Sequence, residues 1–110
     1  MIVGIKCHFD AAHYLPNYPG KCKEMHGHTW TVEVEVCGDV DDETGMVVDL
    51  TILKRDVNNI IDKLDHKLLN DGMRIPTCEN VALYIHDQLI AKYVIQNVKV
   101  QEGDGGWARS

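Results

Sequence analysis

The chain has 110 residues, a formal net charge of −6 at pH 7 and six histidines, and it carries no run of Lys and Arg. The charge argues against a nucleic-acid partner, and no apolar run approaches the roughly 20 residues that a membrane span needs. The length suits one domain over residues 1–110 with a single core, so a deep pocket is expected to need a neighbouring subunit.

Residues 2–13 are predicted to form a half-buried strand, because polar and apolar residues alternate there. The apolar face is formed by Val3, Ile5, Cys7, Phe9 and Ala11. His13 has the parity of this face. The segment 14–23 is rich in Pro, Asn and Gly and is predicted to be a loop.

Residues 28–37 alternate still more regularly, with Trp30, Val32, Val34 and Val36 on one face. Extending this parity backwards puts His28 and His26 on the apolar side. If the two strands pair antiparallel, His13 comes to lie beside both, where opposing Cβ atoms are roughly 4.5–5.5 Å apart. Three imidazoles with an open fourth position are typical of a catalytic zinc, and the thiol of Cys22 is then a candidate acid, base or fourth ligand. The alternative to a metal site is that His26 and His28 are simply polar residues at the start of a strand.

The second half of the chain predicts two helices followed by two strands. Residues 38–45 form an acidic loop, and apolar residues at helical spacing predict a helix over 50–64, capped by Asp49 or Thr51. A second helix is predicted to begin at Pro76-Thr77, with Thr77 as cap and Glu79 in the first turn. Strands are predicted over 94–102 and 107–109, so the helices should cover one face of an antiparallel sheet.

Three polar residues in this half admit two interpretations each. In the first interpretation, His66 lies after the first helix and interacts favourably with the helix dipole, while Asp65 is solvated. In the second, Asp65 and His66 form a carboxylate–imidazole pair for proton transfer. Glu102 has the parity of an apolar face, where a carboxylate is costly without a donor. A ligand with N–H groups would satisfy it, and so would a location at the end of the sheet.

The cysteines predict the redox compartment. Cys7, Cys22, Cys37 and Cys78 include no C-x-x-C pair, and residues 1–6 lack the features of a secretory signal peptide. We therefore expect free thiols in a cytoplasmic protein.

Five segments in order resemble the 6-pyruvoyltetrahydropterin synthase / 6-carboxytetrahydropterin synthase family along nearly the whole chain. They are Phe9–His13 (F-x-A-A-H), Cys22–His28 (C-x-x-x-H-G-H), Leu64–Asn70 (L-D-H-x-x-L-N), Pro76–Asn80 (P-T-x-E-N) and Val98–Glu102, which is similar to the strand with the pterin-anchoring glutamate. The resemblance implies an α+β T-fold of order ββααββ, with a four-stranded antiparallel sheet and two helices on one face. It also implies that three subunits close their sheets into a barrel, that two trimers stack as a homohexamer, and that active sites lie between subunits.

The resemblance further implies the cofactor and the reacting groups. The family's small-molecule substrate is dihydroneopterin triphosphate, and Zn²⁺ would bind at His13, His26 and His28. There it would hold the hydroxyl and carbonyl oxygens of the substrate side chain and, as a Lewis acid, make the adjacent C–H protons removable.

The remaining site residues are also carried over from the family's motifs. Cys22 matches the base, and Asp65 with His66 matches the pair that helps to relay protons. Glu102 would hold the N–H groups of the pterin by charge-assisted hydrogen bonds. Thr77 and Glu79 would contribute to the pterin pocket.

The spacing of the thiol motif favours one branch of the family. Three residues between Cys22 and the H-G-H segment resemble the bacterial and archaeal enzymes, which make 6-carboxy-5,6,7,8-tetrahydropterin, acetaldehyde and triphosphate on the route to 7-deazaguanine nucleosides such as queuosine. We therefore expect a lyase of this type. The alternatives are a 6-pyruvoyltetrahydropterin synthase, side-chain cleavage toward folate, and a pterin- or metal-binding module without turnover.

Two departures from the family pattern bear on these alternatives. Glu24 lies inside the thiol motif, and some relatives use a glutamate as the base for side-chain cleavage. The run Gly103–Gly106 and the short tail differ from the typical final hairpin. The combination of Cys22, Asp65 and His66 argues against a module that only binds.

Overall fold

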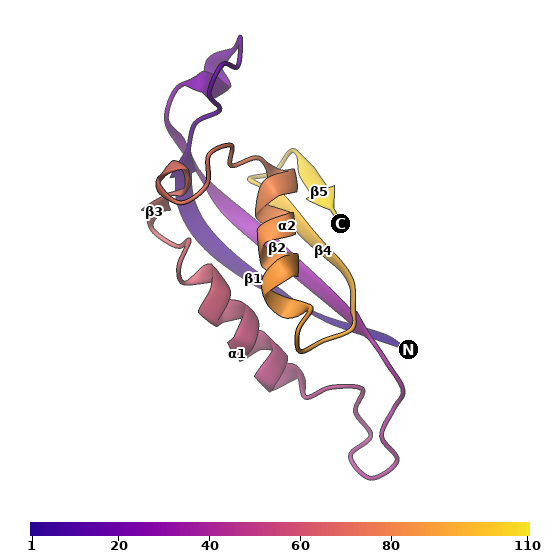
Figure 1. Cartoon of the computed structure of the whole chain (residues 1–110). Helices are drawn as coiled ribbons and strands as arrows, with labels where there is room; N and C mark the ends of the chain where they lie inside the picture. The colour runs from indigo at the N-terminus through magenta and orange to yellow at the C-terminus, as the bar shows by residue number, and fades with distance from the viewer.

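The computed structural model describes residues 1–110 as one sheet with two α-helices packed on it (Figure 1). The strands are β1 (Ile2–His13), β2 (His26–Cys37), β3 (Lys67–Leu68), β4 (Ile95–Glu102) and β5 (Trp107–Arg109), and the helices are α1 (Leu50–Ile61) and α2 (Cys78–Leu89). Two short 3-10 turns, η1 (Lys21–Lys23) and η2 (Leu69–Asp71), complete the elements.

The sheet has the order β3-β1-β2-β4-β5. Apart from β3, which lies between the two helices in the chain, the predicted order ββααββ and the antiparallel pairing of β1, β2, β4 and β5 are confirmed. The four-stranded prediction was incomplete, because β3 adds a fifth strand that runs parallel to β1 and pairs only with Ala11 and Ala12. The closing of such sheets into a trimeric barrel stays a prediction.

Alternation along the strands buries one face of the sheet under the helices. Trp30, Val32, Val34 and Val36 of β2 are at most 1% exposed, and they belong to a single core cluster of 20 buried residues. Figure 1 shows both helices on the same side of the sheet. The opposite face, with Lys6, Glu33 and Lys99 in a row across three strands, carries no helix.

Side-chain caps begin both helices where the sequence indicated. Asp49 accepts hydrogen bonds from the backbone N–H groups of Thr51 and Ile52, and Thr77 accepts one from Asn80. Helix α1 ends at Ile61, three residues before the predicted end, and the chain turns toward His66, which has a φ of 57°. Neither helix is long and apolar enough to cross a membrane.

Asp56 of α1 joins this helix to the turn that follows α2. Its Oδ2 accepts hydrogen bonds from Lys92 Nζ at 2.8 Å and from the hydroxyl of Tyr93 at 2.5 Å. These two donors, Lys92 first, lower the pKa of Asp56 from its ordinary 3.8 to about 2. The contact therefore stabilises the fold whenever this carboxylate is ionised.

We predict that Asp56→Asn lowers the free energy of unfolding by about 1–2 kcal/mol at pH 7, because a charge-assisted acceptor is lost. Since the folded pKa lies below the unfolded one, the stabilisation is complete above about pH 4 and is lost as the pH falls through about 2. Denaturant unfolding at several pH values measures this difference. The exposed Asp87→Asn serves as the control, and an equal loss in both variants would contradict the prediction.

Candidate metal centre and active site

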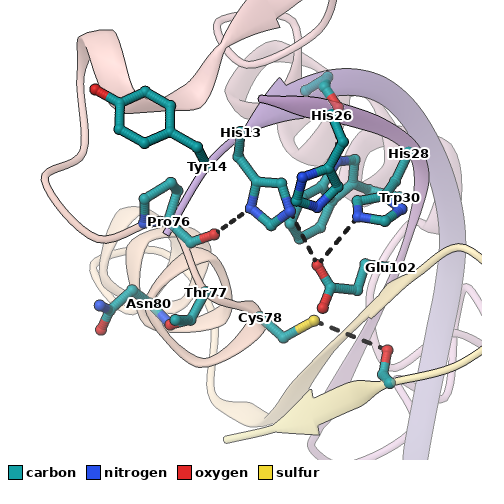
Figure 2. A network of polar contacts seen from close by, with 12 residues as sticks. His13, Tyr14, His26, His28, Trp30, Pro76, Thr77, Cys78, Asn80 and Glu102 are labelled. Atoms are coloured by element: carbon teal, nitrogen blue, oxygen red, sulfur yellow. Dashed lines mark hydrogen bonds and ion pairs between the residues drawn. The ribbon is translucent and has the colours of Figure 1, made fainter. Parts of the chain in front are cut away.

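Three imidazoles meet where β1 ends and β2 begins. His13 is the cross-strand partner of His26, and Ala11 is the partner of His28, so all three rings project from the helix-covered face. Their ring centroids are 4.6, 5.1 and 4.8 Å apart, and one nitrogen of each lies within 4.8 Å of the other two. Figure 2 shows the three rings converging above Trp30. The predicted proximity of the rings is confirmed.

Backbone carbonyls fix the tautomer of two of these rings. The Nδ1–H of His13 donates to the carbonyl of Pro76 at 2.7 Å, and the Nδ1–H of His26 donates to the carbonyl of Glu24 at 2.7 Å. A carbonyl oxygen only accepts, so Nδ1 carries the hydrogen and Nε2 keeps its lone pair. Hydrogen bonds of this kind orient metal-binding histidines in proteins.

The environment of His13 suits a neutral metal ligand. The side chain is 2% exposed, and its Nε2 is buried without a hydrogen-bond partner. Burial lowers the pKa of His13, although the Pro76 carbonyl and Glu102 act in the opposite direction. A neutral ring with an unpartnered, inward-pointing nitrogen fits a metal ion, and three imidazole nitrogens form a donor set that zinc accepts.

Glu102 brings a carboxylate to the same cluster. It lies at the end of β4 opposite Trp30, and its Oε2 is 3.4 Å from His13 Nε2 and 3.7 Å from His28 Nε2 (Figure 2). This Oε2 is buried and accepts no hydrogen bond. The carboxylate is therefore held in a place where a donor is lacking.

Cys78, interpreted from the sequence as a core or boundary residue, lies beside this carboxylate. It is 6% exposed, and its thiol donates to the carbonyl of Gly106 at 3.8 Å. Burial, followed by the charge of Glu102, raises the pKa of Cys78 to about 12. The thiol is thus protonated at neutral pH. Its place beside Glu102 depends on how α2 packs on β4, which no local sequence pattern indicates.

Cys22 lies in η1, within the loop that joins β1 to β2. Figure 1 shows this loop extending beyond the end of the sheet. The thiol is half-buried, and it is not one of the ligand atoms that gather within 4.8 Å of one another. Cys22 is therefore carried on the segment between two metal-ligand candidates, His13 and His26, without belonging to their cluster.

Asp65 and His66 form a second cluster, separate from the imidazoles. Asp65 Oδ2 is 2.9 Å from His66 Nδ1, and its Oδ1 accepts the backbone N–H of Asp10 at 2.9 Å. The Asp10 N–H first, and then His66, lower the pKa of Asp65. Asp10 in turn accepts a hydrogen bond from the hydroxyl of Thr29 at 2.6 Å. The sequence indicated the Asp65–His66 pair but not its two supports.

An open hollow of about 570 Å³ lies on the surface beside the Asp65–His66 pair, and His28 is the one residue of the imidazole cluster that lines it. It is lined by residues 10–12 of β1, 27–29 of β2, and His66 with Lys67. No enclosed pocket surrounds the imidazoles within one chain. This agrees with the expectation that a chain of this length does not build a deep pocket alone.

The two remaining predicted residues lie at the start of α2. The hydroxyl of Thr77 accepts the backbone N–H of Asn80 at 3.1 Å and so serves as the helix cap. Glu79 is exposed in the first turn and makes no ion pair with the imidazoles. Their role toward a substrate stays a prediction.

We predict that the chain binds about one divalent transition metal ion and that His26→Ala or His28→Ala weakens this binding by more than about 100-fold, because a ligand is lost. Zinc titration against a competing chelator measures the affinity. His8→Ala, an exposed histidine of β1, is the matched control. Unchanged affinity in both site variants would contradict the prediction.

Comparison with known proteins places the chain in a family. Residues 2–110 match the family model described as 6-pyruvoyl tetrahydropterin synthase. The chain is 46% identical over 109 residues to an Archaeoglobus fulgidus protein named "Putative 6-carboxy-5,6,7,8-tetrahydropterin synthase". This match covers 98% of this chain and 93% of that protein. The chain is 41% identical over 88 residues to the 6-carboxy-5,6,7,8-tetrahydropterin synthase of Synechocystis sp., and 41% identical over 81 residues to the dihydroneopterin monophosphate aldolase of Pyrococcus furiosus; each match covers 74% of this chain and 68% of the relative.

A solved structure supports the same assignment. The 6-pyruvoyl tetrahydropterin synthase of Caenorhabditis elegans superposes with a TM-score of 0.86 at 28% identity, covering 100% of this chain and 95% of that chain. The sequence match spans nearly all of the chain, and the fold match spans all of it. The chain therefore belongs to the 6-pyruvoyl tetrahydropterin synthase family of enzymes.

Proposed function

We propose that the chain is a zinc-dependent 6-carboxy-5,6,7,8-tetrahydropterin synthase. It converts 7,8-dihydroneopterin triphosphate to 6-carboxytetrahydropterin and releases acetaldehyde and triphosphate, on the route to 7-deazaguanine nucleosides such as queuosine. The observation that carries the proposal is the cluster of His13, His26 and His28, in which one nitrogen of each ring lies within 4.8 Å of the other two. Relatives named for this reaction support the choice of product.

His13, His26 and His28 would hold the zinc ion. When bound there, zinc supplies Lewis acidity to the hydroxyl and carbonyl oxygens of the substrate side chain. The carbonyls of Pro76 and Glu24 keep two of the rings in the tautomer that ligation needs. Trp30, which is fully buried below the rings, keeps water away from the inner side of the site.

Cys22 would act as the base that removes a proton from a carbon of the substrate side chain. A thiolate near a bound cation is favoured over the neutral thiol. The loop between β1 and β2 holds Cys22 outside the ligand cluster, so the thiol remains free to exchange a proton. Cys22 is half-buried, which leaves it accessible to a substrate.

Asp65 and His66 would relay protons for a site that belongs to a neighbouring copy of the chain. Asp65 binds the Nδ1 of His66, and 78% of the His66 side chain is exposed, so the ring is oriented yet accessible. Within one chain this pair forms a cluster distinct from the imidazoles. This separation supports the homo-oligomer that the family resemblance implies, a dimer of trimers, in which each site would draw on two subunits.

Glu102 would anchor the pterin, with Thr77 and Glu79 contributing to its pocket. The buried Oε2 of Glu102 lacks a donor, and the N–H groups of a pterin would supply one through charge-assisted hydrogen bonds. Its position 3.4 Å from His13 Nε2 would bring the pterin close to the metal. All four cysteines are free, which suits a cytoplasmic enzyme.

A second candidate reaction is side-chain cleavage to a hydroxymethylpterin. The specific observation in its favour is Glu24, an exposed carboxylate two residues from Cys22, together with the similarity to an archaeal aldolase. In that reaction Glu24 would be the base.

Product analysis tests the proposal directly. Zinc-loaded protein is incubated with dihydroneopterin triphosphate, and the products are separated by chromatography and identified by mass spectrometry. We expect a carboxypterin with acetaldehyde and triphosphate. A pyruvoylpterin or a hydroxymethylpterin would replace the proposed reaction by one of its alternatives, and unchanged substrate with a loaded site would indicate a binding module.

We also predict that Cys22→Ala lowers kcat by about 10²–10⁴-fold and leaves the zinc content unchanged, since the base is removed while the ligands stay. Cys37→Ala is the matched thiol control, and Glu24→Gln tests the rival base. Turnover that survives in Cys22→Ala but is lost in Glu24→Gln would move the base role to Glu24.

A further inference from the structure

The outer edge of β1 is paired with β3 over a short stretch. β3 pairs with Ala11 and Ala12, and the chain then enters the 3-10 turn η2. The strand ladder therefore stops before it reaches Tyr14, two residues beyond Ala12. Without another partner, the N–H and C=O of Tyr14 would have to find water or remain unsatisfied.

The side chain of Asn70 supplies both missing partners. Its Oδ1 accepts the N–H of Tyr14 at 3.0 Å, and its Nδ2 donates to the carbonyl of Tyr14 at 2.9 Å. The N–H can only donate and the carbonyl can only accept, so the orientation of the amide is determined. One partly buried amide thus replaces the next residue of a strand.

Tyr14 is the root of the loop that carries Cys22. It directly follows His13, and the next residue, Leu15, donates its N–H to the carbonyl of Cys22 at 2.7 Å. Figure 2 shows Tyr14 next to His13. A shift of Tyr14 would therefore be transmitted through one residue to Cys22.

The segment that contains Asn70 is also fixed at its other end. His66 donates its backbone N–H to the carbonyl of Asp10 at 2.6 Å, and Asp65 accepts the N–H of Asp10. Residues 65–70 are thus attached to Asp10 of β1 and again to Tyr14, the residue that follows β1. The position of the Cys22 loop is tied by hydrogen bonds to the segment that carries the Asp65–His66 pair.

We propose that Asn70 is a positioning residue that fixes the root of the Cys22 loop and so determines where the thiol lies relative to the three imidazoles. The proposal rests on the proposed role of Cys22 as the base. Asn70 touches neither a metal ligand nor the thiol, and it acts only through the backbone of Tyr14.

The test compares Asn70→Ala, which removes both hydrogen bonds, with Asn70→Asp, which keeps the acceptor for the Tyr14 N–H. Asn59→Ala, an exposed residue of α1, is the control. The first readout is the rate of alkylation of Cys22 by iodoacetamide, measured by peptide mass spectrometry relative to Cys37 in the same molecule. Both thiols are half-buried, so Cys37 reports any general loosening.

We expect the Cys22-to-Cys37 rate ratio to rise about tenfold in Asn70→Ala and less in Asn70→Asp, while the control is unchanged. In steady-state assays, kcat should fall by about 10-fold or more with KM and zinc content within about twofold, because misplacement of a reacting group costs rate rather than binding. The aspartate variant should recover part of kcat.

An unchanged rate ratio in Asn70→Ala would overturn the proposal, and so would a parallel rise for both thiols with a lower melting temperature. If Asn70→Ala does not fold, the same comparison is made with Asn70→Asp. Failure of the proposed function is distinguishable, because Cys22→Ala would then keep its turnover while the alkylation ratio still responds to Asn70.

Discussion

The site depends on the register between β1 and β2. A slip of one residue would turn every side chain of one strand to the opposite face of the sheet and would separate His13 from His26 and His28. Buried aromatic contacts hold the register near the site. Phe9 and Trp30 are cross-strand partners whose rings lie 5.8 Å apart and nearly parallel, and Trp30 Nε1 donates to the carbonyl of Ala11 at 3.2 Å. The same residues that fill the core therefore align the three candidate metal ligands.

Much of the fold could be predicted from the sequence because it follows from short-range patterns. Strict alternation predicted β1 over Ile2–His13 with its observed bounds. Polar residues before apolar runs predicted Thr77 as one cap and Asp49 or Thr51 as the other, which the structure assigns to Asp49. β3 could not be predicted, since two residues have no periodicity, and it lies directly after Asp65 and His66, which hydrogen-bond to Asp10. The predicted helix over 50–64 was too long because Leu64 continues the apolar spacing and is buried. In the structure α1 ends at Ile61, and Leu64 lies in the turn that follows.

In the candidate site, too, the features set by short-range patterns could be predicted, and those set by long-range packing could not. Parity alone placed the three imidazoles together, because a strand period of two is rigid. Three contacts could not be predicted from the sequence: the hydrogen bond of His13 to the Pro76 carbonyl, the two hydrogen bonds of the Asn70 amide to Tyr14, and the contact of Cys78 with Glu102. Each joins segments that only the packing of α2 or of residues 65–70 brings together. Every residue has a backbone carbonyl. The sequence therefore does not indicate which carbonyls accept the Nδ1–H of His13 and His26 and so fix their tautomers.

The margins of the sheet have a consequence for the lone subunit. β3 pairs only with Ala11 and Ala12, and most of the outer side of β1 is left without a partner strand, while the opposite margin ends in β5, which has three residues. Unsatisfied N–H and C=O groups along such a margin act as a template for another chain. A freshly synthesised monomer would therefore be prone to disordered aggregation. In the homo-oligomer proposed above, a second copy docked along these margins would cover them, so that protection from aggregation and completion of the active site would come with the same step of assembly.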